Sequence, residues 1–189
     1  MGLKSYMPEV STINETKHRT FFRSTNGETE NEVIKVIEYE KYDGLTFNKK
    51  NVYNLGFADY DINKDDFIDT TLTGNDDQYL VFNTVLNTVP KFFETNQDDV
   101  IFIMGSDSSD EFAQECIKNC PKKRKCKEQC KKQNQRIRTY CGFITRHYEN
   151  LIKDYEFSGG YIDEKGNITE VMTFEKREVY ECIFVIKRK

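Results

Sequence analysis

The stretch Val100-Ile101-Phe102-Ile103-Met104-Gly105-Ser106 decides the fold class of this 189-residue chain. Five consecutive apolar residues that end at a Gly-Ser turn are typical of a strand buried on both faces. A helix is expected before it, because Asn75 suits an N-cap and an apolar stripe with helical spacing runs from Leu80 to Phe93. A second amphipathic helix is expected over residues 137–155.

Strand patterns lie on both sides of this helix–strand–helix centre, while residues 1–18 show no clear period and are expected to be a frayed start. The order predicts an α+β fold, a mostly antiparallel sheet packed by two main helices, in a single domain spanning residues 1–189. The expected outer strands are 18–24, 33–42, 52–60, 67–72, 156–162, 168–174 and 181–186.

Composition and charge narrow the class of protein. The 14 Phe and 11 Tyr residues exclude a wholly disordered chain. Residues 117–138, called the basic segment below, contain ten Lys or Arg residues and one acidic residue. The net charge of −4 therefore leaves −13 on the rest of the chain. An acidic protein with one basic segment points to a binding surface on that segment.

Several motifs resemble an uncharacterised family of small proteins, a domain of unknown function found mainly in Bacteroidota. The stretch Tyr53-Asn54-Leu55-Gly56-Phe57-Ala58-Asp59-Tyr60 is similar to its Y-N-L-x-F-x-D-Y signature. The stretch VIFIMGS at 100–106 and the later R-x-R-x-Y at 136–140 are similar to its apolar strand, G-S turn and helix start. The ending FVIKRK at 184–189 is similar too. The resemblance implies a cytosolic α+β protein and no particular reaction.

The chain departs from that family pattern between the G-S turn and R-x-R-x-Y. We interpret residues 109–135 as an inserted, cysteine-rich, basic helical hairpin, called the inserted hairpin below. It contains a four-cysteine cluster with the spacing C-x3-C-x5-C-x3-C: Cys116, Cys120, Cys126 and Cys130. On a helix, residues four apart share a face, so each pair is expected to project its thiols together.

Four converging thiolates suit a structural zinc ion, and nearby Lys and Arg residues stabilise thiolates. The same spacing suits two disulfides or redox-responsive thiols across a hairpin, although a cytosolic location disfavours disulfides. Free cysteines are the third alternative, because common zinc patterns usually include C-x2-C. The sequence alone leaves all three open.

The cations of the inserted hairpin are candidate contacts to nucleic-acid phosphates, and such binding depends strongly on salt. The alternatives are a solvated hairpin tip or a dock for an acidic protein surface, including a second copy of the chain in a homo-oligomer. The segment contains no aromatic residue to stack single-stranded bases. The candidate residues are Lys122, Lys123, Arg124, Lys125, Lys127, Lys131 and Lys132.

A second constellation combines an anion site with candidate catalytic residues. Ser106, Arg136 and Arg138 can bind an anion at a Gly-Ser turn and a helix start. Asp59, Arg136, Arg138 and Tyr140 are the candidate catalytic residues, with Asp59 as base or metal ligand. The structural alternative is that Asp59 pairs with Arg138 or caps a turn, and that Ser106 caps a helix.

Two functions of different classes follow. The first is a cytoplasmic binding protein whose four-cysteine hairpin contacts nucleic acid or a protein partner. The alternative is a nuclease or phosphoryl-transfer enzyme, for example a component of a toxin–antitoxin or phage-defence pair. No apolar run approaches the roughly 18 residues of a membrane span, and Met1–Tyr6 lacks the apolar region of a secretory signal. The sequence therefore predicts a cytoplasmic protein without a membrane partner.

Overall fold

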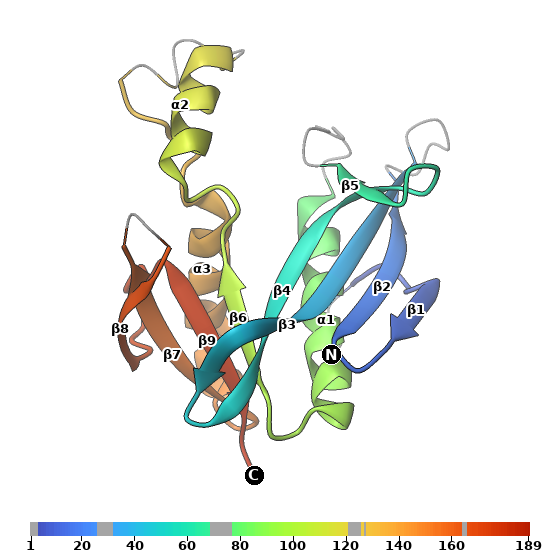
Figure 1. The fold of residues 1–189 in the computed structure, drawn as a ribbon, viewed down its shortest axis with the longest axis vertical. Coiled ribbons are helices and arrows are strands. Elements are labelled where there is room, and N and C mark those ends of the chain that lie inside the picture. The colour runs from blue at the N-terminus through green and yellow to red at the C-terminus, as the bar shows by residue number, and fades with distance from the viewer. Residues whose placement is uncertain (1–3, 26–31, 69–76, 121–125, 127, 164–165) are drawn as a thin grey trace. The chain divides into compact units, whose positions relative to one another are not determined.

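A computed structural model describes residues 4–25, 32–68, 77–120, 126, 128–163 and 166–189. The chain divides into two compact units, Met1–Asp99 and Val100–Lys189. Figure 1 shows their elements. The inserted hairpin lies within the second unit.

The first unit contains an antiparallel sheet and the helix α1 (Gln78–Thr95). Its strands follow the order β1-β2-β3-β4, with the short β5 paired to the end of β4. The expected strand at 52–60 is present, with the alternate residues Tyr53, Leu55 and Asp59 buried and Leu55 opposite Tyr39. The strands are β1 (Val10–Ile13), β2 (Lys17–Ser24), β3 (Val33–Phe47), β4 (Lys50–Asp61) and β5 (Asp66–Ile68).

Aromatic packing forms the core of this unit, where α1 covers one face of the sheet (Figure 1). The Phe92 ring of α1 stacks on Tyr39 with centroids 4.6 Å apart and meets the Tyr53 ring edge-on at 5.1 Å. Phe22, Ile37 and Phe92 are each at most 3% exposed. Such rings bury large areas, which compensates for the modest apolar content of the chain.

The second unit contains the strand order β6-β9-β7-β8, again with antiparallel pairings. The predicted central strand is confirmed, with Val100 to Ile103 buried. The helix α3 buries Ile137, Cys141 and Ile144. The elements are β6 (Val100–Met104), α2 (Asp110–Asn119), α3 (Gln135–Leu151), β7 (Tyr155–Ile162), β8 (Ile168–Thr173) and β9 (Cys182–Lys187).

The α+β prediction is confirmed, and two local expectations differ from the structure. The expected frayed start is wrong, because β1 pairs with β2, with Val10 opposite Phe21. The four residues of β1 are held by pairing with β2 across a short turn, and so short a strand shows little period of its own. In the inserted hairpin the first arm is the helix α2, while residues 128–134 form bends and turns and end at Asn134 with a φ of 60°. None of the helices among the described residues has the length and apolar character needed to cross a membrane.

Candidate metal centre

The helix α2 begins and ends where its sequence dictates. The Phe112 amide donates to the Ser109 hydroxyl oxygen at 3.1 Å, and acidic residues occupy the first turn. The helix ends at Cys120, whose backbone is extended (φ −62°, ψ 114°), as expected for a residue that precedes proline. No residue of α2 is fully buried, so apolar packing contributes little to holding it.

Three of the four thiols of the cluster converge at this end of α2, where the Sγ atoms of Cys116, Cys120 and Cys126 all lie within 4.8 Å of one another. Cys130 adjoins this group, because its sulfur makes hydrogen bonds with Cys116 and Cys126. The pairs predicted from the i, i+4 spacing therefore meet, although Cys126 and Cys130 are brought together through turns rather than a helix.

Protons are distributed unevenly over these thiols. The hydrogen bond to the Cys130 sulfur raises the pKa of Cys116 to about 12. Burial raises the pKa of Cys130. Hydrogen bonds from Cys116 and from the backbone amides of Lys132 and Gln133 lower this pKa by more, so it lies below the ordinary value for a thiol. Of the pair Cys116 and Cys130, Cys130 is thus the sulfur on which negative charge is better stabilised. Backbone amides aimed at a sulfur are also the outer contacts that orient thiolate ligands of a metal.

The donor set fits a tetrahedral thiolate site. Zinc–sulfur bonds of about 2.3 Å place tetrahedral sulfurs about 3.8 Å apart, within the observed limit of 4.8 Å. A bound dication would displace the thiol protons and stabilise all the thiolates. The cluster Cys116, Cys120 and Cys126 can therefore hold a metal ion, and Cys130 is positioned to supply the fourth ligand.

The segment after Cys130 is fastened to the turn that follows β6. The Gln133 side chain donates to the Ser108 carbonyl at 3.2 Å, and the Asn134 amide donates to the Asp107 carbonyl at 3.1 Å. These contacts tie both ends of the inserted hairpin to the second unit. The cluster therefore lies on an anchored base rather than on a free tail.

Part of the predicted anion site is brought together, but the helix start is occupied by a carboxylate. The Arg136 guanidinium donates to the Ser106 hydroxyl, while the Arg136 amide donates to Asp107 Oδ2 at 2.9 Å. Asp107 is 5% exposed, and its negative charge opposes an anion at the α3 N-terminus. Arg138 is exposed, and burial raises the pKa of Tyr140 to about 12, so its phenol is neutral at pH 7.

Asp59 belongs to the first unit, and its carboxylate pairs with the Lys35 ammonium across β3 and β4. Both residues are buried, at 8% and 6% exposure. The sequence analysis missed Lys35 as this partner. The available signal was its position on the apolar face of β3, two residues before Ile37 and four before Tyr39. A charged residue at such a position requires a buried counter-ion.

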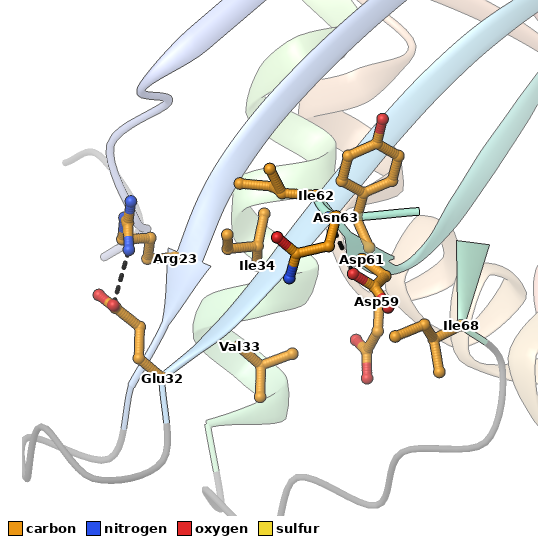
Figure 2. A pocket seen from close by; sticks show the side chains of 10 residues that line it. Arg23, Glu32, Val33, Ile34, Asp59, Asp61, Ile62, Asn63 and Ile68 are labelled. Atoms are coloured by element: carbon orange, nitrogen blue, oxygen red, sulfur yellow. Dashed lines mark hydrogen bonds and ion pairs between the residues drawn. The ribbon is translucent and has the colours of Figure 1, made fainter. Parts of the chain in front are cut away.

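A groove of about 550 Å³ lies beside Asp59 in the first unit (Figure 2). Figure 2 shows Arg23 paired with Glu32 on one side and the Asn63 amide bonded to Asp61 on the other. Asp59 also lines the groove, and its carboxylate is held by Lys35. Each charged side chain that lines the groove thus has a partner within the first unit.

The described cations of the inserted hairpin are exposed. Lys131 and Lys132 directly follow Cys130 and point into solvent, and the amide of Lys132 contacts the Cys130 sulfur. Lys122, Lys123, Arg124, Lys125 and Lys127 lie outside the described residues.

A family model described as a family of unknown function, DUF6934, matches residues 3–112. The chain belongs to this family. The DUF6934 match confirms the resemblance to an uncharacterised family, and its span includes residues 53–60 and 100–106, whereas the stretches at 136–140 and 184–189 lie beyond it. It ends at the third residue of α2, before the first cysteine of the cluster. No curated protein and no solved structure matches the chain.

Proposed function

We propose that this DUF6934 member is a nucleic-acid-binding protein whose basic segment is organised by one structural zinc ion bound by Cys116, Cys120, Cys126 and Cys130. The observation that supports the proposal is the convergence of three of these thiols, with Cys130 hydrogen-bonded to Cys116, in the segment that contains ten of the chain's 28 Lys and Arg residues. Zinc is the metal of choice for four thiolates, because it is soft enough for sulfur and accepts tetrahedral geometry.

The polar character of the inserted hairpin supports a metal staple. A segment that buries little apolar surface cannot offset the entropy lost on ordering, and small polar modules commonly use a metal for this purpose. The helix α2 has no fully buried residue, whereas Cys120 and Cys126 are 6% and 4% exposed. Among the described residues of this hairpin, these two cysteines are therefore the buried ones. The structure joins none of the six described cysteines by a disulfide, so all four cysteines of the cluster can serve as ligands.

The proposed nucleic-acid contacts are to phosphates rather than to bases. Lys131 and Lys132 are exposed next to a metal ligand, and the basic segment offers Lys and Arg side chains without aromatic residues. Point charges on flexible stems bind the phosphate backbone and carry little sequence information. We therefore expect binding to double-stranded nucleic acid that is independent of sequence and weakened by salt.

Native mass spectrometry of the reduced, full-length chain tests the metal. We expect one zinc ion per chain, lost on adding a chelator and lost in the Cys126→Ser variant. Cys141→Ala is the matched control, because Cys141 is a buried cysteine on α3 outside the cluster, and it should retain the metal. A metal-free mass after zinc has been supplied, or equal loss in the control, would refute the metal centre.

Fluorescence anisotropy with a labelled duplex at several salt concentrations tests the binding. We expect Lys131→Ala combined with Lys132→Ala to lower the slope of log affinity against log salt by about 2, since each phosphate contact contributes about 0.9. Lys49→Ala combined with Lys50→Ala removes the same charge from the β3–β4 turn and should leave the slope unchanged. Absent duplex binding in the zinc-loaded protein, or equal loss in both variants, would refute the nucleic-acid function. Binding to an acidic protein surface would then be the alternative.

The enzyme alternative has no comparable support among the described residues. Asp59 is held by Lys35 within the first unit, and the phenol of Tyr140 is neutral at pH 7. Arg136 is engaged with Ser106 and Asp107 at the start of α3. These contacts stabilise local structure, although the partners differ from those expected: Asp59 pairs with Lys35 instead of Arg138, and Ser109 instead of Ser106 caps α2.

A further inference from the structure

The four thiols of the cluster differ in their access to solvent. Cys116 and Cys130 are half-buried, whereas Cys120 and Cys126 are 6% and 4% exposed. The cluster therefore has an outer pair, Cys116 with Cys130, and an inner pair, Cys120 with Cys126. A small oxidant in solution reaches the outer pair first.

The two thiols of the outer pair are also in direct contact. The Cys116 thiol donates a hydrogen bond to the Cys130 sulfur, and this contact joins α2 to the turn before α3. Sulfur atoms already in contact need only a small movement to reach the roughly 2.05 Å of a disulfide bond. The sulfurs of the inner pair lie within 4.8 Å of each other, so they are placed to form a second disulfide after the outer pair has been oxidised.

We propose that the four-cysteine cluster is an oxidation site at which a peroxide converts Cys116 and Cys130 to a disulfide and releases the bound metal. This inference rests on the proposed metal centre and adds a regulation of it. The chemistry needs one co-reactant, a peroxide such as hydrogen peroxide, and no further oxidant.

The reaction balances in two steps. One thiolate of the outer pair attacks one peroxide oxygen, the O–O bond breaks, and a sulfenic acid forms while the other oxygen leaves as hydroxide, which is protonated to water. The sulfur of the partner cysteine then attacks the sulfenic sulfur, forming the S–S bond between Cys116 and Cys130 and expelling the second oxygen as water. Two sulfurs lose one electron each, and the peroxide gains two. With two of four thiolates removed, the remaining pair no longer closes a tetrahedral site.

The other cysteines provide internal controls. Cys141 and Cys182 are 4% and 0% exposed and belong to α3 and β9. Burial raises the pKa of both thiols, which keeps them protonated and slow to react. Oxidation confined to the outer pair would therefore distinguish a site from general damage.

The experiment treats zinc-loaded, full-length protein with one equivalent of hydrogen peroxide. Released zinc is followed with a chromogenic chelator, and the disulfide is located by non-reducing peptide mapping. We expect one zinc released for each Cys116–Cys130 disulfide formed, restored by a thiol reductant and added zinc. The Cys141→Ala variant should behave like the natural chain. Zinc retained after peroxide, or a different first disulfide, would overturn the inference while leaving the metal centre intact.

A chain that never binds zinc would instead refute the metal centre and the proposed release with it. In that case mapping of the reduced, metal-free protein after peroxide still tests the pairing. A Cys116–Cys130 disulfide would support the oxidation site alone, and its absence would overturn it.

Discussion

Replacing Asp59 by Leu should destabilise the first unit strongly, because it leaves the Lys35 ammonium buried without its counter-ion. The side chains of Lys35 and Asp59 are 8% and 9% exposed, so water screens the pair little. Removing one partner of a buried ion pair costs about 3–5 kcal/mol, a large part of a total stability of about 5–15 kcal/mol. With a urea m-value of about 2 kcal/mol/M, the unfolding midpoint should fall by about 2 M.

The double variant Lys35→Met with Asp59→Leu provides the decisive comparison. Replacing a whole buried pair by apolar side chains is often neutral or stabilising, so most of the lost stability should return. Lys176→Met is the matched control, because it breaks the ion pair between Lys176 and Glu149, whose side chains are 43% and 75% exposed respectively. Loss of this exposed pair should cost less than about 1 kcal/mol. Urea unfolding followed by circular dichroism measures all three. A single variant as stable as the natural chain, or a double variant no better than the single, would refute this reasoning.

Two further predictions concern glycine packing and pH. Gly159→Ala should destabilise the second unit by about 1–3 kcal/mol, because a Cβ there would lie 2.2 Å from the Tyr180 ring. Gly142→Ala should stabilise α3 by about 0.5–1 kcal/mol, because no atom lies within 4 Å of the added Cβ. Thermal unfolding should show shifts of opposite sign for the two variants. Burial beside Phe92 lowers the pKa of His18, so protonation favours the unfolded chain. The contribution of neutral His18 to the stability is therefore fully present above a pH of about 6.5 and is lost as the pH falls below that value. The difference between the urea midpoints at pH 7.5 and pH 5.5 should be smaller in the His18→Gln variant than in the natural chain. An unchanged difference would contradict this assignment.

Elements with a strong local period could be predicted from the sequence. Residues 100–104 form the buried strand β6, and the two main helices occur as α1 and α3 with boundaries moved by a few residues. Apolar spacing records which face of an element is buried, so it predicts both type and orientation. The early strand β1 escaped prediction because its structure depends on hydrogen bonds to β2.

The sites were harder to predict because they depend on register. The Asp59 carboxylate pairs with Lys35 because β3 and β4 place these residues opposite each other, 24 positions apart in the chain. The interpretation of Asp59 as a partner of Arg138 could not include this register. By contrast, Cys116 and Cys120 are one helical turn apart, and their convergence could be predicted from spacing alone.

The extent of the family match separates two questions about this chain. The matched residues 3–112 contain the whole first unit and β6, together with the buried Lys35–Asp59 pair. The four-cysteine cluster begins at Cys116, beyond the match, so zinc or nucleic-acid binding would be a property of this chain and would not by itself explain the family. If the double variant Lys35→Met with Asp59→Leu is stable, the pair is dispensable for folding. Urea unfolding of that variant would therefore show whether this buried pair, which lies within the matched residues, is needed for the stability of the first unit.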